Sequence, residues 1–300
     1  RFDVRASMVV NAAGAGAAEV AARIARRASV VAPMTGIALN LVIAGDCGPT
    51  AFAIVSRDGD RMRRLFVVPW RGRTIVGTAH YPCVRAPSST EELEPYVERF
   101  VREVAAAWPA RSITRESVLL VHAGMQPLHE MRGPPAHLIV DHAKDGTPQM
   151  LTAVGPKLTT ARAIAAELVD IVCARTGRTV KRCETATRLL ASAPEEDVEI
   201  LVARALAADR AELPDDVVRH LVRSYGADYE AIVALVRERP ALGDRVEAGS
   251  PVIAAQLEYG VLEEMAMRPE DLVNRRTELG QTARATPRAR AVAGDQLRLV

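Results

Sequence analysis

The stretch from Leu151 to Gly177 combines a reactive side chain with a backbone turn suited to an anionic or electron-rich ligand. A short apolar run ends at Gly155, Pro156 fits the first turn of a helix, and Lys157 adds a positive charge. A helix that starts here exposes unpaired N–H groups and the positive end of its dipole. The stretch therefore predicts a ligand site at a strand-to-helix turn. A βα unit with a merely solvated Lys157 explains the same residues.

A glycine-rich stretch near the N-terminus is a second place where the backbone could approach a ligand closely. Gly14 and Gly16 lie in AAGAGAAE, after the apolar run from Ser7 to Val10 and before a helical stripe. Glycine allows close approach because it has no Cβ. The stretch lacks the third glycine of the GxGxxG fingerprint that binds a pyrophosphate. Taken alone, it is also explained by ordinary packing of a strand against a helix.

Several histidines fall in one region beside Asp141, at positions 122, 129, 137 and 142. Their spacing matches no zinc signature such as HExxH. We therefore predict no metal site.

The hydrophobic pattern predicts two architectures in succession. Residues 1–182 alternate between apolar runs and helical stripes, and Met34 to Val84 has the β-branched runs and Gly/Asp turns of an antiparallel sheet. Helical periodicity dominates after about residue 196. We expect a mixed α/β (α+β) domain over 1–182, an α-helical domain over 183–280 and a mobile tail over 281–300. The expected strands are 7–10, 38–44, 51–55, 65–69, 74–78, 113–128, 137–142 and 151–154, and the expected helices lie within 12–27, 90–108, 156–177, 196–208, 214–224, 228–238, 251–267 and 269–276.

The composition is that of a globular protein with an ample core: of 300 residues, 49% are hydrophobic and 25% are charged. The formal net charge of +2 provides no global field that would attract nucleic acid. The cysteines show no CxxC spacing, which favours reduced thiols and a cytoplasmic protein. No apolar run is long enough to cross a bilayer.

Four segments, in the same order along the chain, resemble those of the FAD-dependent glycerol-3-phosphate dehydrogenases, in the D-amino-acid-oxidase-like superfamily. VGPKLTTAR resembles the family's GGKLTTYR, MVVNAAGAGA its VNAxGPW, LFVVPWRGRTIVGTAH its PWxGxxxxGTTD, and AGMQPL its GxRPL. The run from Leu213 to Gly280 resembles its helical C-terminal domain. The resemblance implies the C-terminal part of a FAD-binding Rossmann-like domain, an antiparallel substrate-domain sheet and then an α-helical domain.

The resemblance also implies where FAD and the catalytic groups lie. Lys157 and the helix start behind it would stabilise the charge of the reduced flavin, while FAD carries the redox step. His80 stands in place of the acid of GTTD, and His142 lies in VDHA, where the family has an Arg-Asp-His-like run. Each is expected to be a catalytic base or a hydrogen-bonded histidine at a strand end. The implied cofactor-binding residues are Asn11, Ala12, Gly14, Gly155, Pro156, Lys157, Leu158 and Thr159.

Gln126 and Arg71 are the expected substrate contacts. In the family, GxRPL supplies an arginine to the substrate phosphate, whereas Gln126 is a neutral amide and Val140 aligns with a second arginine. Each lost charged hydrogen bond costs roughly 1.5–3 kcal/mol of binding. We therefore expect a small-molecule substrate other than glycerol 3-phosphate, still a secondary alcohol or related reduced carbon acid that passes hydride to flavin. His80, His142 or Arg71 could compensate.

Two interpretations of the whole chain stay open. The missing GxGxxG fingerprint predicts that an N-terminal dinucleotide-binding segment is absent, so this chain alone is expected to bind FAD poorly. The alternative is a non-catalytic, truncated or degenerate homologue that acts as an interaction module. For the enzyme, we expect a quinone or another electron acceptor, with peripheral contact at the inner membrane as one option.

Overall fold

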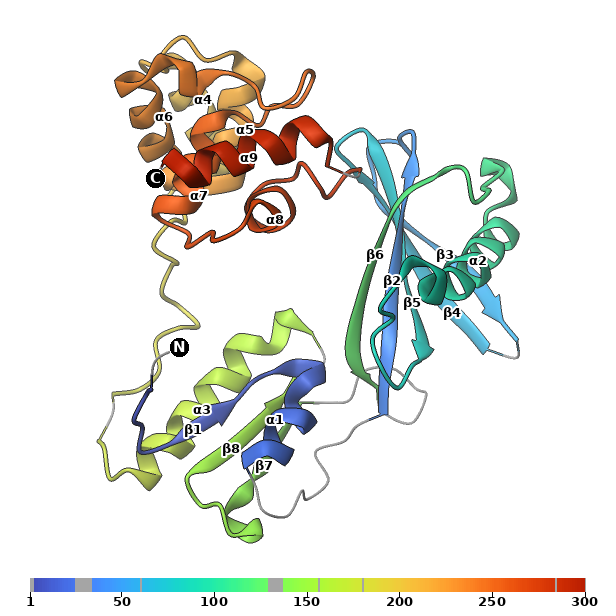
Figure 1. Ribbon diagram of the computed structural model, residues 1–300, viewed down its shortest axis with the longest axis vertical. Coiled ribbons are helices and arrows are strands. Elements are labelled where there is room, and N and C mark those ends of the chain that lie inside the picture. The colour runs from blue at the N-terminus through green and yellow to red at the C-terminus, as the bar shows by residue number, and fades with distance from the viewer. Residues whose placement is uncertain are drawn as a thin grey trace. The chain divides into compact units, whose positions relative to one another are not determined.

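The computed structural model describes residues 3–24, 34–59, 61–128, 137–155, 157–179, 181–283 and 285–299. The chain divides into two compact units, Arg1–Arg188 and Leu189–Val300 (Figure 1). The first unit contains strands and helices, whereas the named elements of the second are helices. The expected fold class, a mixed α/β region followed by a helical one, is confirmed.

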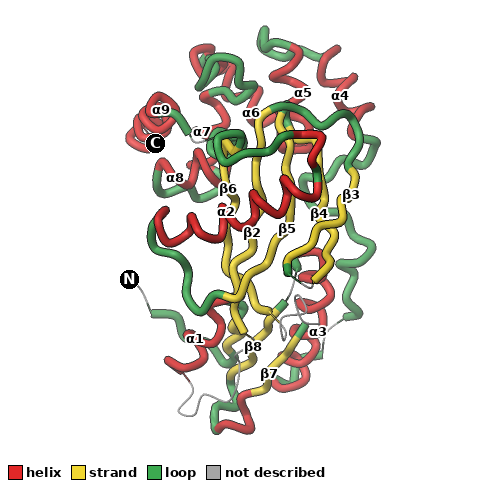
Figure 2. Tube along the Cα trace, turned by 90° about the vertical axis from the view of Figure 1, so that its right-hand side faces the viewer, coloured by secondary structure: helices red, strands yellow, loops and turns green. Residues whose placement is uncertain are grey.

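A five-stranded antiparallel sheet in the first unit has the order β3-β4-β5-β2-β6. Helix α2 (Thr90–Ala107) lies across one face of this sheet (Figure 2). A buried apolar core forms between them, because alternate residues of the strands point toward the helix. The strands are β2 (Met34–Ala44), β3 (Phe52–Asp58), β4 (Arg61–Trp70), β5 (Arg73–Pro82) and β6 (Val118–Leu128). The core includes Ile37, Leu39, Leu41, Leu65, Val67, Val76, Tyr81, Val97, Phe100 and Val104.

Helix α2 begins after an N-cap residue, Ser89. The Ser89 side chain accepts a hydrogen bond from the backbone N–H of Glu92 at 3.3 Å. Glu91 and Glu92 occupy the first turn, where negative charge favours the helix dipole.

We call the other side of the five-stranded sheet, away from α2, the open face. Directly opposite residues of antiparallel strands point to the same side. The pairs Ala38–Gly124 and Asn40–His122 of β2 and β6 therefore share this face. Each of these residues is partly or fully exposed, in contrast to the core positions between them.

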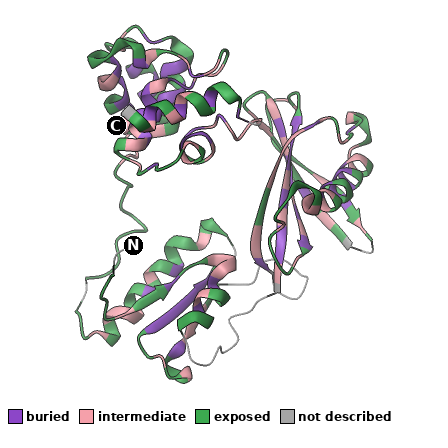
Figure 3. Ribbon diagram, in the orientation of Figure 1, coloured by how far each residue is buried: buried purple, intermediate pink, exposed green. Residues whose placement is uncertain are grey.

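A second sheet has three strands in the order β1-β8-β7. β1 (Val9–Asn11) runs parallel to β8 (Met150–Val154), and β7 (Leu138–Asp141) is antiparallel to β8. β8 is buried along its whole length (Figure 3). Both parallel strands lead into helices, as in a Rossmann-like domain. These elements are η1 (Gly14–Gly16) and α1 (Ala17–Ile24) after β1, and η4 (Leu158–Thr160) and α3 (Ala161–Arg175) after β8.

The second unit is built from helices around two apolar clusters. No helix in the described part of the chain is long and apolar enough to cross a membrane. The helices are α4 (Val198–Ala207), α5 (Asp215–Tyr225), α6 (Tyr229–Glu238), α7 (Ala254–Leu262), α8 (Pro269–Asp271) and α9 (Pro287–Leu299), with a π-helical turn η7 (Leu272–Arg276).

The structure corrects the prediction of a mobile tail over 281–300, because this segment contains α9. Ala289 and Ala293 are fully buried, and Gln296 Nε2 donates to Glu258 Oε2 at 2.8 Å. The buried stripe of α9 consists of alanines at helical spacing. The arginines between them made the segment look polar, which is why the prediction was wrong.

Candidate cofactor and substrate site

Two strand-to-helix turns meet at one edge of the three-stranded sheet. Asn11, the last residue of β1, pairs with Thr152 of β8 in the parallel register. The turns that follow, 12–16 and 155–160, therefore leave the sheet at the same edge. In open α/β sheets, ligands bind outside the carboxyl ends of parallel strands. The structure thus brings together the two segments that the sequence predicts to bind the cofactor.

The first turn has the conformation and the space for close approach of a ligand. Gly14 has φ +57°, in the left-handed region that favours glycine. A Cβ at Gly14 would meet no heavy atom within 4 Å. Ala12 is exposed beside it.

The Asn11 side chain lies in the protein interior and stabilises the first turn by hydrogen bonds. Its Nδ2 donates to Ala17 O at 2.8 Å and to Thr152 Oγ1 at 3.2 Å. Its Oδ1 accepts from the Ala13 N–H at 3.2 Å. The side chain is 4% exposed and hydrogen-bonded within the protein, so a contact of Asn11 with a cofactor would come from its backbone.

The second turn presents its side chains to the outside. Lys157, Leu158 and Thr159 are exposed, Leu158 to 94%. The Lys157 carbonyl accepts from the Thr160 N–H at 3.2 Å and from Thr160 Oγ1 at 2.9 Å, which fixes the backbone of the turn. Gly155 is exposed too, whereas Pro156 lies outside the described residues.

His142 lies in the interior, which corrects its expected role as a catalytic base. It opens the 3-10 turn η3 (His142–Asp145) and is fully buried. Its Nε2 is 2.8 Å from Thr152 Oγ1, and its Nδ1 is 3.3 Å from Asp145 Oδ2. Both ring nitrogens are engaged, so His142 is the hydrogen-bonded histidine of the two alternatives.

His80 lies on the open face of the five-stranded sheet, opposite Ala38 of β2. Burial lowers the pKa of its imidazole, and the charges of Arg63 and Lys157 lower it further. The influence of Lys157 places this part of β5 near the second turn. A neutral imidazole at this position can accept a proton, which fits the expected role of a base.

Gln126 shares the open face with His80, because its partner on β2 is Gly36, two residues before Ala38. Its Nε2 is a buried donor without a hydrogen-bond partner in the described structure. The sequence motif identifies this position, but only the structure shows the unsatisfied donor.

Arg71 lies at the far end of the sheet from these groups. It forms, with Gly72, the two-residue turn between β4 and β5, and its φ is +52°. Strands rise about 3.3 Å per residue, so the length of β5 separates Arg71 from His80 by roughly 25–30 Å. Trp70 precedes Arg71 at the end of β4. The centre of its ring lies 5.8 Å from that of His122, so it packs on the open face and not in the core against α2. The structure does not bring Arg71 to the expected substrate site.

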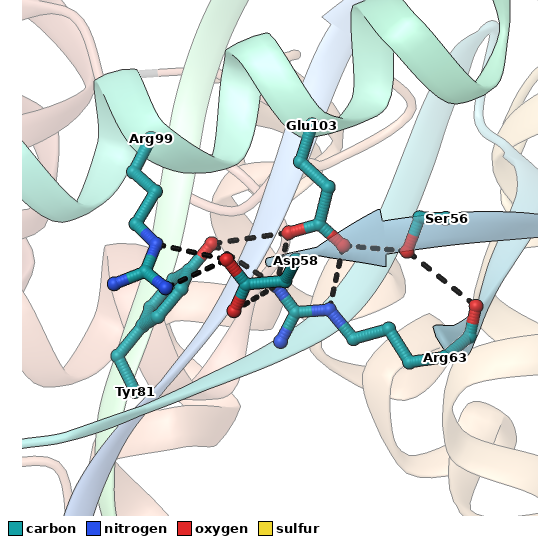
Figure 4. Close-up of polar contacts among 6 residues, drawn as sticks. All are labelled: Ser56, Asp58, Arg63, Tyr81, Arg99 and Glu103. Carbon is teal, nitrogen blue, oxygen red and sulfur yellow. Dashed lines mark hydrogen bonds and ion pairs between the residues drawn. The ribbon is translucent and has the colours of Figure 1, made fainter. Parts of the chain in front are cut away.

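A buried ion-pair cluster, which the sequence analysis missed, joins α2 to the sheet (Figure 4). Glu103 accepts hydrogen bonds from Ser56 Oγ at 2.5 Å and from Arg63 Nε at 2.6 Å. Tyr81 Oη donates to the other carboxylate oxygen at 3.3 Å, and the same oxygen pairs with Arg63. Arg63 and Glu103 are 40 residues apart, and no local pattern identifies them as partners.

Asp58 and Arg99 extend this cluster through an ion pair of 2.6 Å. Burial raises the pKa of Tyr81 to about 12. Burial also lowers the pKa of Arg63, but its hydrogen bond and charge interaction with Glu103 outweigh this and raise it above its ordinary value. The cluster fixes α2 on the sheet behind His80.

The described residues form no metal-binding group, and the two cavities lie away from the candidate site residues. Among the residues whose placement is described, no group of three His, Cys, Asp or Glu side chains could hold a metal ion. A cavity of about 440 Å³ beside β6 is lined by residues that include Ser88 and Gly124, and one of about 670 Å³ by residues that include Met8 and Arg175. Neither contains His80, Gln126 or Lys157.

Comparison with known proteins shows which proteins the chain is similar to. A family model described as the C-terminal domain of alpha-glycerophosphate oxidase matches residues 183–297. The glycerol-3-phosphate dehydrogenase of Synechocystis sp. is 30% identical over 221 residues, which cover 72% of this chain and 40% of that protein. Glycerol-3-phosphate dehydrogenase 1 of Mycobacterium tuberculosis is 28% identical over 310 residues, covering 99% of this chain and 56% of that protein. The chain is similar to glycerol-3-phosphate dehydrogenases over nearly its whole length.

A solved structure of this family shows the same fold. The glycerol-3-phosphate dehydrogenase from Bacillus halodurans, complexed with FAD, has a TM-score of 0.68 and 20% identity, covering 97% of this chain and 61% of that one. The family resemblance read from the sequence is confirmed. The chain spans 40% and 56% of the length of the two relatives named above.

Proposed function

We propose that this protein is an FAD-dependent dehydrogenase that oxidises a secondary alcohol. The observation that carries the proposal is the meeting of the turns 12–16 and 155–160 at the carboxyl edge of β1 and β8. One turn contributes an open glycine backbone at Gly14, and the other contributes the exposed cation of Lys157. The similarity to glycerol-3-phosphate dehydrogenases and the likeness to an FAD-bound structure support flavin as the ligand.

The residues at this edge fit a flavin cofactor. FAD bound here would supply the hydride acceptor. Backbone at Gly14 would approach it closely, and Leu158 and Thr159 would border it. Lys157 would stabilise negative charge on the reduced flavin ring, because a fixed positive charge beside the ring lowers the energy of the negatively charged form.

His80 is the residue best placed to handle the proton of the alcohol. Oxidation of a secondary alcohol removes a hydride from carbon and a proton from oxygen. His80 is neutral on the open face, near Lys157, so that it can take the proton.

We also propose that the electrons pass on to a quinone or another acceptor, through peripheral contact of a cytoplasmic protein with the inner membrane. The four free cysteines support a reducing compartment. The alternative is a non-catalytic interaction module. Such a module requires neither the open turn at Gly14 nor the exposed Lys157, so these two features favour the enzyme.

The test has two parts. With FAD above its dissociation constant, amide hydrogen exchange should slow in 12–16 and 157–160 and stay unchanged in 109–117, at the distant end of the sheet. Anaerobic incubation of the FAD-loaded protein with secondary alcohols should yield the carbonyl product. Protection confined to other segments, or FAD-loaded protein that oxidises no secondary alcohol, would refute the proposal.

A further inference from the structure

A chain of buried side-chain hydrogen bonds crosses the three-stranded sheet. It runs from His142 in η3, after β7, through Thr152 of β8 to Asn11 at the end of β1, and Figure 1 shows these strands side by side. The three residues are between 0% and 4% exposed. Buried polar groups are costly unless each finds a partner. The partners therefore indicate where the hydrogen atoms of the chain lie.

Two backbone groups fix the orientation of the Asn11 amide. Ala17 O can only accept, so it is Nδ2 that faces it at 2.8 Å. The Ala13 N–H can only donate, so it is Oδ1 that faces it at 3.2 Å. The second hydrogen of Nδ2 then goes to Thr152 Oγ1 at 3.2 Å. Because Ala13 and Ala17 flank Gly14–Gly16, one amide holds both ends of the first turn.

The Thr152 hydroxyl indicates which ring nitrogen of His142 carries the hydrogen. Its oxygen accepts from Asn11, and its own hydrogen needs an acceptor. Among the described residues, the other hydrogen-bond partner of this oxygen is His142 Nε2 at 2.8 Å. A hydrogen on Nε2 would leave the buried hydroxyl hydrogen without an acceptor. With the hydrogen on Nδ1, Nε2 accepts from Thr152 and Nδ1 donates to Asp145 Oδ2 at 3.3 Å.

We propose that His142, with its hydrogen on Nδ1, is a positioning residue for the first turn. Its Nε2 orients the Thr152 hydroxyl, the hydroxyl accepts from the Asn11 amide, and the amide holds the turn 12–16 open at Gly14. The role of this turn in binding a cofactor rests on the dehydrogenase function proposed above. The inference adds a residue to that function whose own side chain is closed to solvent.

Positioning of the turn and general stabilisation of the sheet have different consequences. If the chain of hydrogen bonds only stabilised the sheet, loss of the Thr152 hydroxyl would loosen both ends of β1 alike. If it positions the turn, the effect is confined to the end that leads into the turn. Two amides distinguish these cases: Ala13, which donates to Asn11 Oδ1, and Val9, which donates to Gln149 O at 2.8 Å at the start of β1.

The first measurement needs neither a variant nor FAD. A two-bond ¹H–¹⁵N correlation spectrum of the ¹³C,¹⁵N-labelled chain at neutral pH reports which ring nitrogens of His142 carry hydrogen. The ring is assigned through the backbone and Cβ resonances of the same residue. We expect a hydrogen on Nδ1 and none on Nε2. A hydrogen on Nε2 would overturn the proposal.

Amide hydrogen exchange tests the connection to the turn. Thr152→Val keeps the size of the side chain and should speed exchange at Ala13 about three- to tenfold, as for one lost neutral hydrogen bond, without a change at Val9. Thr152→Ser should restore slow exchange. Thr74→Val is the matched control, because Thr74 is also fully buried and donates to Gly45 O at 2.8 Å in the other sheet. Equal acceleration at Val9 and Ala13, or none at Ala13, would overturn the proposal.

Titration with FAD separates this inference from the proposed function. Followed by the Gly14 amide resonance, the dissociation constant should be about three- to tenfold higher in Thr152→Val than in the wild type and Thr152→Ser. Equal constants would remove His142 and Thr152 from cofactor positioning. If FAD left the Gly14 amide of the wild type unshifted, the proposed cofactor site would be refuted instead. The ring and exchange measurements would then still decide whether His142 fixes the turn.

Discussion

Lys157 follows the three-stranded sheet and His80 lies in the five-stranded sheet, yet the charge of Lys157 contributes to the lowered pKa of His80. This electrostatic link places the cation of the second turn and the base on the open face in one neighbourhood. Lys157 is suited to stabilise charge on a reduced cofactor, and His80 to accept a proton from the substrate. The two roles can be separated by experiment.

In FAD-loaded protein, we expect Lys157→Ala to slow flavin reduction by about a hundredfold, the usual order for loss of one group that stabilises developing charge. Lys181→Ala, which removes an exposed lysine outside the two turns, should have no effect. Stopped-flow absorbance under anaerobic conditions measures both. Equal rates in Lys157→Ala and the wild type would remove Lys157 from the mechanism.

His80 should make the first unit less stable in mild acid. Its pKa in the folded state is lowered, so below the unfolded value of about 6.5 the unfolded chain binds a proton that the folded chain does not. The free energy of unfolding should therefore decrease as pH falls below about 6.5. Denaturant titrations from pH 7 to pH 5 should show a smaller decrease for His80→Gln. An identical slope in both proteins would contradict the lowered pKa.

At the scale of elements, the cluster around Glu103 holds α2 on the five-stranded sheet. The Glu103 side chain is 4% exposed, and its removal would leave Arg63 partly buried without its main partner. We expect Glu103→Ala to lower the free energy of unfolding by about 3 kcal/mol, the order found when one member of a buried pair is removed. Glu98→Ala, on the exposed side of the same helix, breaks the surface pair with Arg102 and should change it little. If chemical denaturation gave equal changes in the free energy of unfolding for the two variants, the cluster would not be what holds α2 on the sheet.

Helix α9 gives a second matched pair of variants. Ala289 is fully buried, whereas Ala291 on the same helix is exposed. Ala289→Leu should destabilise the second unit by about 1–3 kcal/mol through overpacking, and Ala291→Leu should not. Thermal unfolding followed by circular dichroism measures the difference. A tolerated Ala289→Leu would mean that α9 does not pack as the structure shows.

The helices and strands were largely predictable from the sequence, because apolar periodicity and capping residues determine them locally. The expected helix 90–108 corresponds to α2, and Gly155 marked the end of β8. Contacts between distant segments were not predictable. Nothing local pairs Glu103 with Arg63, and nothing local shows that His142 is buried between Thr152 and Asp145. The candidate site was found through its motifs, and the structure then placed the side chains of Asn11 and His142 in the interior and Arg71 at the far end of the sheet.

At the scale of the whole molecule, we propose that this chain supplies the flavin edge and the substrate face of an alcohol dehydrogenase. The chain contains no GxGxxG turn to hold a pyrophosphate, so we expect it to bind FAD weakly by itself. Joined to an N-terminal βαβ segment that carries such a turn, it should retain FAD through gel filtration. Full FAD occupancy of the isolated chain would contradict the expected weak binding.

The most direct measurement is the absorbance of this FAD-loaded protein, mixed without oxygen with a secondary alcohol. We predict that the yellow flavin band is lost in a single saturable phase, with one carbonyl product formed for each flavin reduced. Full FAD occupancy with a flavin band that no secondary alcohol bleaches would contradict it.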